Sequence, residues 1–354
     1  MTQGSSIPGS PIQRTELSAC DQAAFFLQSG FWGAFKARFG WEALAFKVEQ
    51  EGGFPLLVLR RSLMRGFSLA YIPWGPQLPP GLPDEARGAV LKRLALAIKA
   101  QLPPDTVFIR FDPPWYTEGA GTPSPQIPAP FVRAGADIQA PDTVLVDLNQ
   151  PMEGLLAQMK PKWRYNARLA LKKGVTLRRA ASGEIGVFYG LLKETAGRDG
   201  IAIHSEEYYK ALLEINEWYK GSGADTRLYL AEHEGDTIAG IVTLFRGREA
   251  VYLYGASSDK KRNLMAPYAL QVKAMEDAIT AGCGQYDLFG IPPNDDPAHP
   301  MAGLYRFKTG FGGRIIHRPG SWDFPCRPLI YRLFRSAESF RKKALSLKKK
   351  RITV

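Results

Sequence analysis

The sequence predicts an α/β (α+β) protein made of two similar domains in tandem, and an internal repeat is the main observation behind this. One copy of the repeat has predicted strands at 54–61 and 67–76, a helix at 84–101 and a strand at 106–111. The other has predicted strands at 237–247 and 250–258, a helix at 267–282 and a strand at 285–289. Alternating β-branched and aromatic residues predict the strands, and a Pro-Pro pair follows each copy. Two unrelated hairpin–helix–strand units would show the same order, so chance similarity stays open.

The length of 354 residues allows about two domains. We expect a first domain over 1–147, completed by a C-terminal segment over 316–354, and a second domain over 148–315. A duplicated unit of this kind favours a cleft between the two domains. The second predicted helix supports this scheme, because its apolar residues recur on one face: Tyr268, Val272, Met275 and Ile279.

The composition is that of an ordinary globular protein, with 45% hydrophobic and 23% charged residues. No run of about 18 apolar residues appears, so no membrane-spanning helix is expected. The first 16 residues lack a basic segment followed by an apolar one, as an export signal would have. Cys20, Cys283 and Cys326 are far apart and lack the spacing of metal ligands. We therefore expect a reduced, cytoplasmic protein with neither a metal site nor a cofactor.

The net charge of +12 is concentrated in two segments. From Arg327 to the end the chain has ten Lys or Arg residues and one acid, Glu338. Residues 158–179 contain eight Lys or Arg residues and no acid. Such blocks favour polyanions such as nucleic acid, phosphorylated ligands or an anionic membrane, although a solvated helix face gives the same pattern.

A hairpin followed by a helix and a strand fits the core of the Gcn5-related N-acetyltransferase fold. In that fold a Gly-rich turn after the second hairpin strand presents backbone N–H groups to the pyrophosphate of coenzyme A. The corresponding segment here, "SDKKRNLMAPYAL" (258–270), has no glycine, and "PWGPQLPPGLPDEA" in the first copy is rich in proline. The sequence thus predicts two domains of this fold and disfavours coenzyme A binding.

Five motifs occur in a fixed order along the chain. They are "FLQSGFWGAFKARFGW" (26–41), "KPKWRYNARLALKKGV" (160–175), "KETAGRDGIAIHSEEYY" (193–209), "YLYGASS" (252–258) and "YRFKTGFGG" (305–313). With them the chain resembles the FemABX peptidyltransferases over nearly its whole length. Those enzymes add amino acids from aminoacyl-tRNA to peptidoglycan precursors. No long charged heptad segment appears, so the chain is similar to the compact members, which lack a helical arm.

The resemblance implies transfer of Gly, Ala or Ser from aminoacyl-tRNA to a stem-peptide amine, which forms an interpeptide bridge. The acceptor would be UDP-MurNAc-pentapeptide or a lipid-linked precursor. This aminolysis uses an activated ester, so the protein needs to align the substrates and stabilise the oxyanion rather than supply a nucleophile. Two alternatives stay open: an acyltransferase of this fold for exopolysaccharide or protein modification, and a non-catalytic tRNA- or membrane-binding protein.

Two residues are candidates for catalysis. Lys308 lies between aromatic residues and a glycine cluster. The resemblance implies that it is the catalytic lysine, which would face the oxyanion or the terminal ribose of the tRNA from a Gly-rich turn. Asp112 ends a predicted strand and is a candidate general base for the ammonium proton. A surface lysine at a hairpin tip and a turn-forming aspartate would explain the same patterns.

The acceptor site is predicted from five further residues. The resemblance implies that Lys36 and Arg198 grip the diphosphate of the precursor and that Tyr254 contacts it nearby. Trp74 and Gly75 are candidates for lining the same groove. Each has an ordinary alternative: a surface lysine, an arginine neutralised by Asp199, a core tyrosine, or a structural turn.

The basic segment 160–179 is a candidate surface for the tRNA acceptor arm. The predicted contacts are Lys160, Lys162, Arg164 and Arg168, with Trp163 and Tyr165 available for stacking on nucleotides. An exposed helix with no ligand would show the same residues.

The C-terminal segment predicts an amphipathic helix. We expect 328–340 to pack on the first domain and 341–351 to contact a polyanion, such as anionic lipid at the inner face of the cell membrane. A monomer is favoured, because the internal duplication already supplies two domains.

Overall fold

The computed structural model describes residues 11–49, 53–64, 66–78, 81–119 and 126–352, with side chains of the last helix as far as Phe340. These residues form two compact units, each of which is described by itself. Unit 1 consists of 11–116, 126–141 and 318–352, and unit 2 of 117–119 and 142–317. Apart from the short segment 117–119, the chain therefore changes unit after Pro141 and His317, whereas the sequence predicted changes after 147 and 315. The reason is that strand β8 (Asp142–Asp147) pairs with β13 and β14 of the second sheet.

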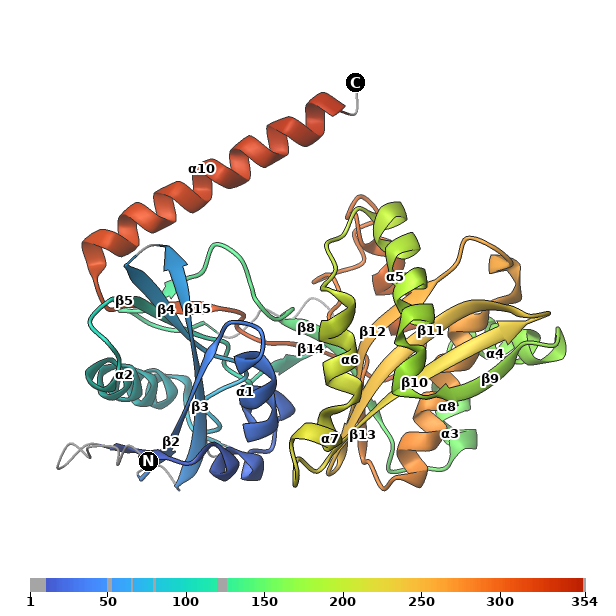
Figure 1. The fold of residues 1–354 in the computed structure, drawn as a ribbon, viewed down its shortest axis with the longest axis horizontal. Helices are drawn as coiled ribbons and strands as arrows, with labels where there is room; N and C mark the ends of the chain where they lie inside the picture. The colour runs from blue at the N-terminus through green and yellow to red at the C-terminus, as the bar shows by residue number, and fades with distance from the viewer. Residues whose placement is uncertain (1–10, 50–52, 65, 79–80, 120–125, 353–354) are drawn as a thin grey trace. The chain divides into compact units, whose positions relative to one another are not determined.

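Unit 1 is built on a seven-stranded sheet in the order β1-β2-β3-β4-β5-β15-β7 (Figure 1). Its strands are β1 (Ile12–Thr15), β2 (Glu42–Val48), β3 (Phe54–Met64), β4 (Phe67–Ile72), β5 (Thr106–Phe111), β7 (Val132–Arg133) and β15 (Trp322–Pro325). Its α-helices are α1 (Gly30–Ala37), α2 (Asp84–Gln101) and α10 (Pro328–Ile352). Short 3₁₀ turns at Leu17–Gln22 and Phe26–Gln28 precede α1.

The central strand of unit 1 explains how the sheet is covered. All six residues of β5, "TVFIRF", are buried, as expected of a strand with helices on both faces. One face contacts α2 through residues such as Leu91 and Leu94. The other face contacts α10 through Tyr331 and Phe334. The predicted packing of the C-terminal helix on the first domain is thus confirmed for its first two turns.

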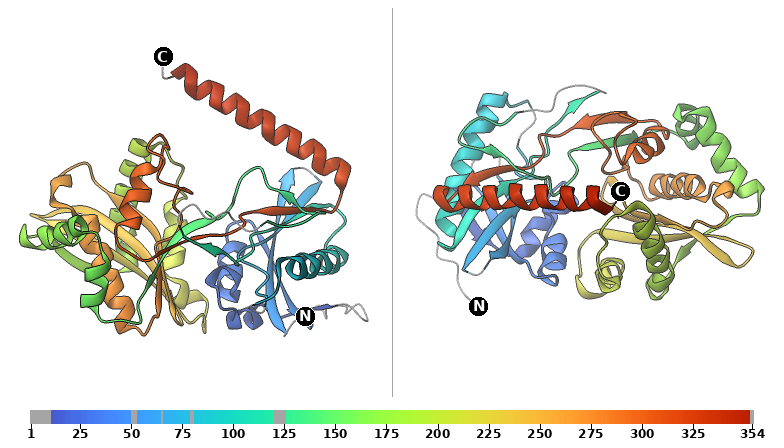
Figure 2. Two further views of the ribbon diagram at one scale, coloured as in Figure 1. Left: turned by 180° about the vertical axis from the view of Figure 1, so that it is seen from behind. Right: turned by 90° about the horizontal axis from the view of Figure 1, so that it is seen from above.

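Unit 2 contains an eight-stranded sheet in the order β6-β14-β8-β13-β12-β11-β10-β9. Its remaining strands are β6 (Thr117–Glu118), β9 (Thr176–Ala180), β10 (Ala224–His233), β11 (Asp236–Arg246), β12 (Glu249–Ser257), β13 (Gln285–Asp287) and β14 (Arg314–His317). Its α-helices are α3 (Met152–Gln158), α4 (Pro161–Lys172), α5 (Ile185–Asp199), α6 (Glu206–Leu213), α7 (Ile215–Trp218), α8 (Ala266–Thr280) and α9 (Ala302–Thr309). Helices α5 and α6 lie on one face of this sheet, and α3, α4 and α8 on the other (Figures 1 and 2).

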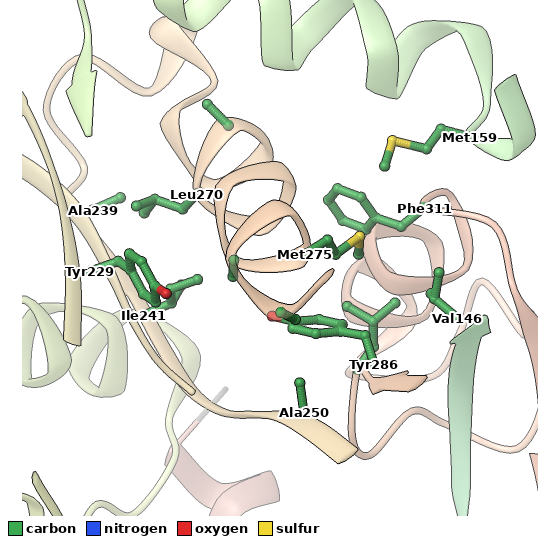
Figure 3. Close-up of a cluster of buried hydrophobic side chains, with 14 of the residues drawn as sticks. Val146, Met159, Tyr229, Ala239, Ile241, Ala250, Leu270, Met275, Tyr286 and Phe311 are labelled. Carbon is green, nitrogen blue, oxygen red and sulfur yellow. The ribbon is translucent and has the colours of Figure 1, made fainter. Parts of the chain in front are cut away.

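The core of unit 2 lies between α8 and the sheet. Met275 of α8 and Tyr286 of β13 are fully buried there beside Phe311 (Figure 3). The Tyr286 hydroxyl donates to Gln271 Oε1 at 2.8 Å, so the one polar group of this ring is satisfied inside the core.

The internal repeat is present in the fold. In unit 1, β3 pairs with β4 antiparallel and β4 with β5 parallel, with α2 between the last two strands. In unit 2, β11 pairs with β12 antiparallel and β12 with β13 parallel, with α8 between them. The predicted order of hairpin, helix and strand is therefore confirmed in both copies. None of the described helices has the length and hydropathy needed to cross a membrane.

Candidate functional site

Lys308 lies in the last turn of helix α9, and its side chain is buried, with 6% of its surface exposed. The sequence placed it on a Gly-rich turn. The glycines instead follow the helix, which ends at Thr309, so Lys308 is held by helical backbone before them. The alternative of a surface lysine at a hairpin tip is wrong.

The ammonium of Lys308 is positioned where two strands separate. The parallel pairing of β12 with β13 ends at Val251 and Asp287. Just beyond, Lys308 Nζ donates to the carbonyl oxygens of Phe289 at 3.1 Å and Gly290 at 2.9 Å. It also lies 5.2 Å from the centre of the Tyr252 ring. The amine thus binds the carbonyl groups that follow β13 and contacts the Tyr252 ring of β12.

Burial changes the protonation of this amine. Desolvation lowers the pKa of Lys308 to about 7, although the nearby carboxylate of Asp287 acts in the opposite direction. Both the ammonium and the neutral amine are therefore populated near neutral pH. With two N–H groups held by carbonyls, the ammonium has one further donor and the neutral amine has a lone pair.

The glycine cluster supports α9 by allowing close approach. A Cβ at Gly310 would lie 2.0 Å from the Trp163 indole of α4. Trp163 Nε1 donates to the Phe307 carbonyl at 2.8 Å, which fixes α4 against α9. Gly313 has φ +88°, and a Cβ there would lie 2.5 Å from the Leu145 carbonyl oxygen. The predicted stacking of Trp163 on a nucleotide is not available in this structure, because the indole is used inside unit 2.

Tyr254 and Arg198 lie on the face of the unit 2 sheet that α5 and α6 cover. The ring of Tyr254 meets that of Tyr209 on α6 edge-on, with centres 5.0 Å apart. Arg198, in the last turn of α5, forms ion pairs with Asp199 at 3.0 Å and Asp259 at 2.8 Å. It also donates to the Ser257 carbonyl at 3.1 Å, so it ties α5 to the end of β12. The neutralisation by Asp199 that the sequence left open is present, and a role in binding diphosphate stays a prediction.

A bulge in β12 separates Tyr252 from Tyr254. Tyr252 pairs with Thr243 and Tyr254 with Val242, so Leu253 is an extra residue in the ladder. Consequently one tyrosine contacts Lys308, whereas the other contacts α6.

The basic segment 160–179 that the sequence assigned to tRNA forms helix α4 and most of strand β9, where Arg178 and Arg179 pair with acidic residues. Lys160, Lys162, Tyr165 and Arg168 are exposed, and 62% of the Tyr165 surface is accessible. Arg164 differs, because its Nη1 donates to the carbonyls of Leu156, Ala157 and Met159, at 3.1, 2.9 and 2.7 Å. It therefore satisfies the last carbonyls of α3 and is a structural residue rather than an open contact.

Asp112 in unit 1 is held in a buried network at the end of β5. Only 3% of its surface is exposed. Its Oδ2 accepts a hydrogen bond of 2.5 Å from the Tyr71 hydroxyl, and its Oδ1 accepts one from the Ser321 hydroxyl. Burial raises the pKa of this carboxyl to about 6, although both hydroxyls act to lower it. The carboxyl therefore titrates just below neutral pH, and a role as general base stays a prediction.

Trp74 and Gly75 are packed beside Asp112. The Gly75 N–H donates to the Asp112 backbone carbonyl at 3.1 Å, and a Cβ at Gly75 would lie 2.9 Å from the Gln28 side chain. Trp74 is 1% exposed, and the guanidinium of Arg318 lies over its indole, 4.2 Å from the ring centre. The predicted lining role of Trp74 does not fit this conformation, because a buried indole offers no surface to a ligand.

Lys36 is positioned by the motif that begins with Gln28. The Gln28 amide donates to Pro73 O at 2.6 Å and accepts from Leu57 N at 3.0 Å, so it fixes the start of α1 to β3 and to the residue that follows β4. Ser29 Oγ then caps the helix by accepting from Trp32 N. Two turns later the helix presents Lys36.

The ammonium of Lys36 shares an aromatic platform with a second cation. Lys36 Nζ lies 5.7 Å from the ring centre of Trp32 and 5.8 Å from that of Trp41. The guanidinium of Arg61 lies 5.5 Å from the Trp41 ring centre. Burial, together with the like charge of Arg61, lowers the pKa of Lys36 to about 8. Two cations beside one tryptophan repel each other, and a bound anion would reduce this repulsion.

In unit 1 the predicted residues Lys36 and Asp112 are connected through side chains that were not predicted from the sequence. Trp41 contacts the Tyr71 ring, with centres 6.1 Å apart, and Tyr71 binds Asp112. Lys36 and Asp112 are therefore linked through two aromatic side chains. Ser321 could not have been found from the sequence, because it is separated from Asp112 by 209 positions. Trp41 lies in the quoted motif 26–41, which was its one available signal.

The start of α8 is a poor site for the pyrophosphate of coenzyme A. Pro267 lies in the first turn and has no N–H to offer. Lys261, just before this turn, pairs with Glu234 at 3.2 Å and Asp236 at 2.9 Å. These contacts agree with the absence of a Gly-rich turn in the sequence.

Comparison with known proteins identifies a family and several relatives. The model of the FemAB family matches residues 129–232 and 226–339, which together make up more than half of the chain. A lipid II:glycine glycyltransferase of Staphylococcus saprophyticus is 23% identical over 253 residues, which cover 55% of this chain and 61% of that protein. The match thus spans less than two thirds of that relative. A protein of the same name from Staphylococcus aureus (strain COL) is 23% identical, with 87% of this chain and 89% of that protein covered.

Solved structures agree with the fold. The crystal structure of FemX covers 90% of this chain and 97% of its own chain, with 20% identity and a TM-score of 0.72. A tandem GNAT protein from the clavulanic acid biosynthesis pathway covers 89% and 98%, with 13% identity and a TM-score of 0.51. The two acetyltransferase-like units predicted from the repeat are therefore confirmed as a fold. The chain belongs to the FemAB family.

Proposed function

We propose that this protein is an aminoacyltransferase that adds an amino acid, glycine in the first instance, to a peptidoglycan precursor. The names of the matched relatives, lipid II:glycine glycyltransferases, support glycine as the transferred residue and a lipid-linked acceptor. Aminoacyl-tRNA as the donor, transfer of Ala or Ser, and UDP-MurNAc-pentapeptide as an acceptor rest on the motifs of the sequence. The buried amine of Lys308 is the observation that carries the proposal.

The reaction requires a new C–N bond and loss of a C–O bond. The acceptor amine attacks the ester carbonyl, the carbonyl oxygen becomes negative, and the ribose oxygen then leaves and takes a proton. In its ammonium form Lys308 has one N–H beyond those given to Phe289 and Gly290, which is what an oxyanion needs. In its neutral form it accepts a proton, and a pKa of about 7 lets one group do both.

Asp112 is proposed to accept the proton that the acceptor ammonium must lose before attack. Its pKa of about 6 keeps the carboxyl mostly ionised at neutral pH while leaving it basic enough to take a proton. Lys36, with Arg61, is proposed to bind the diphosphate of the acceptor, since both cations lie on one tryptophan. The roles of Arg198 and Tyr254 in binding the precursor are proposed in the same way.

Helix α4 is proposed to bind the acceptor arm of the tRNA. Tyr165 and Arg168 lie three positions apart on the exposed side of the helix, with Lys162 and Lys160 near its start. An exposed aromatic ring among cations suits a stacked nucleotide next to phosphates. The surface comprises Lys160, Lys162, Tyr165 and Arg168, without Arg164 and Trp163. The protein is proposed to act as a cytoplasmic monomer that associates with the inner face of the membrane.

The test is a product assay by mass spectrometry with the full chain. Purified protein is incubated with mixed aminoacyl-tRNAs and, separately, with a UDP-linked and a lipid-linked acceptor. A mass gain of one glycine residue on the lipid-linked acceptor is expected, and Lys308→Ala should abolish it. Lys210→Ala, an exposed lysine of α6 in the same unit, is the matched control. Transfer from acyl-coenzyme A in place of tRNA would favour an acyltransferase of another pathway. Absence of any product, with tRNA binding intact, would favour a non-catalytic protein.

A further inference from the structure

Helix α10 has two apolar stripes, of which only one is covered. Ile330, Tyr331 and Phe334 pack on β4 and β5. Leu329, Leu333 and Phe340 are 76%, 71% and 71% exposed, more than any other large apolar side chain described. At about 100° per residue these three lie within about 40° of each other, so they form one continuous stripe. The expectation that all of 328–340 serves for packing is therefore wrong for this stripe.

A groove with cationic walls borders the same helix. It has a volume of about 740 Å³ and an apolar floor that includes Val132, Phe324 and Tyr331. Its charged lining residues are Lys92 of α2 and Arg332 and Arg335 of α10. Glu338, one turn beyond Arg335, is the one acid from Arg327 to the end of the chain. An apolar stripe next to a cationic groove is suited to a surface that combines hydrocarbon with negative charge.

The charges decide between possible partners of this stripe. A second copy of the chain would bring together two segments that each have ten Lys or Arg residues and one acid, which repel each other. A nucleic acid would be attracted by the arginines but would leave Leu329, Leu333 and Phe340 in water. An anionic bilayer satisfies both features, because acyl chains cover the stripe and lipid phosphates meet the arginines.

We propose that α10 lies on an anionic lipid bilayer through Leu329, Leu333 and Phe340, with lipid phosphates held at the groove by Lys92, Arg332 and Arg335. The contact begins at the first turn of the helix, ahead of the 341–351 segment that the sequence indicated. Unit 1 is thereby fastened to the membrane by a helix that also packs on its sheet, so the unit keeps a fixed side toward the lipid. This surface needs neither tRNA nor precursor, so its test is separate from that of the proposed transferase.

The experiment is vesicle flotation with the full chain and no substrate. Vesicles of phosphatidylcholine alone are compared with vesicles that also contain phosphatidylglycerol. The protein should bind the anionic vesicles, and Leu329→Ser/Leu333→Ser/Phe340→Ser should weaken binding by a factor of about 10 or more. Arg332→Gln/Arg335→Gln should weaken binding to anionic vesicles about tenfold and leave the weak binding to neutral vesicles unchanged. Leu96→Ser/Met64→Ser, at positions about half exposed elsewhere in unit 1, should bind as the original does.

Three results would overturn the proposal. The first is that the triple serine variant floats with anionic vesicles as well as the original. The second is concentration-dependent dimerisation that the triple variant abolishes, which would assign the stripe to a second copy. The third is loss of tRNA retention in the triple variant with lipid binding intact. Circular dichroism and the thermal midpoint should not change in the triple serine variant, since Leu329, Leu333 and Phe340 are exposed. For the double glutamine variant both are measured alongside flotation, because Arg335 is half-buried.

Discussion

The two copies of the repeat differ at the end of their parallel strand pair. In unit 1, β4 and β5 stay paired through Ile72 and Phe111, and the Asp112 N–H still donates to the Ile72 carbonyl. In unit 2, the pairing of β12 and β13 ends at Val251 and Asp287, and Lys308 fills the space beyond. Unit 1 thus buries the Asp112 carboxyl just after β5, whereas unit 2 buries the Lys308 amine near the equally buried Asp287 carboxyl that ends β13.

Burial moves the pKa values of these two groups toward neutral pH from opposite sides. The pKa of Asp112 rises to about 6, and that of Lys308 falls to about 7. In both cases desolvation is the largest cause, because each charged form loses its hydration. The comparison teaches that one duplicated scaffold can hold either kind of group close to its titration point, according to the side chain that meets the strand end.

The largest effect is expected on the rate of product formation when Lys308, the buried amine of unit 2, is replaced. Lys308→Met should lower the single-turnover rate of product formation about 100- to 1,000-fold, because a donor to the oxyanion is lost. The affinity for the acceptor should change little, since its proposed anchors, Lys36 and Arg61, are unaltered. Rapid-quench kinetics would measure the rate, with Lys210→Met as the control. An unchanged rate would remove Lys308 from the chemistry.

The second prediction concerns the carboxyl of unit 1. Because its pKa is raised in the fold, the wild-type protein loses stability as the pH rises from the ordinary value of 3.8 through about 6. Asp112→Asn removes that loss, so the variant should be more stable at pH 7 by up to about 3 kcal/mol. Below pH 3.8 the carboxyl is neutral in both states and this gain should vanish. Urea unfolding at pH 4 and pH 7 checks it, and a gain of equal size at both pH values would contradict the assignment.

The third prediction tests the contact between α4 and the end of α9, which supports the Lys308 amine. Gly310→Ala would place a Cβ 2.0 Å from the Trp163 indole, so α4 and α9 must move apart. We expect a loss of about 2 kcal/mol in the free energy of unfolding together with reduced activity. Gly303→Ala is the matched control, because Gly303 lies in α9, which Gly310 directly follows, and has no heavy atom within 4 Å of its Cβ. That variant should be as stable as the original or slightly more so.

The smallest effect is expected at the cation pair of unit 1. Arg61→Gln should raise the pKa of Lys36 toward its ordinary value, because a like charge is removed. It should also weaken the binding of inorganic pyrophosphate about fivefold, as expected for one exposed charge. Calorimetry would measure binding and NMR titration the pKa, with Lys47→Gln as the control. Equal affinity in the two variants would exclude Arg61 from the anion site.

Much of the fold could be predicted from the sequence, because its signals are local. Alternation of β-branched and aromatic residues predicted the strand "TVFIRF", and the spacing of Tyr268, Val272 and Met275 predicted α8. The boundary between the units was harder to predict from the sequence. Strand β8 reads as the end of the first domain, but its partners β13 and β14 come more than a hundred residues later, so no local pattern shows them.

The sequence by itself determined that there are two related hairpin–helix–strand units, that the charge is concentrated in α4 and α10, and that Lys308 and Asp112 are the residues to examine. These follow from side-chain type and spacing, which are properties of the chain. Only the tertiary structure decided what surrounds them. The hydroxyls of Tyr71 and Ser321 on Asp112, the carbonyls of Phe289 and Gly290 on Lys308, and the exposed stripe of α10 all depend on contacts between distant segments. Desolvation sets the two pKa values, and it exists only once those segments have packed.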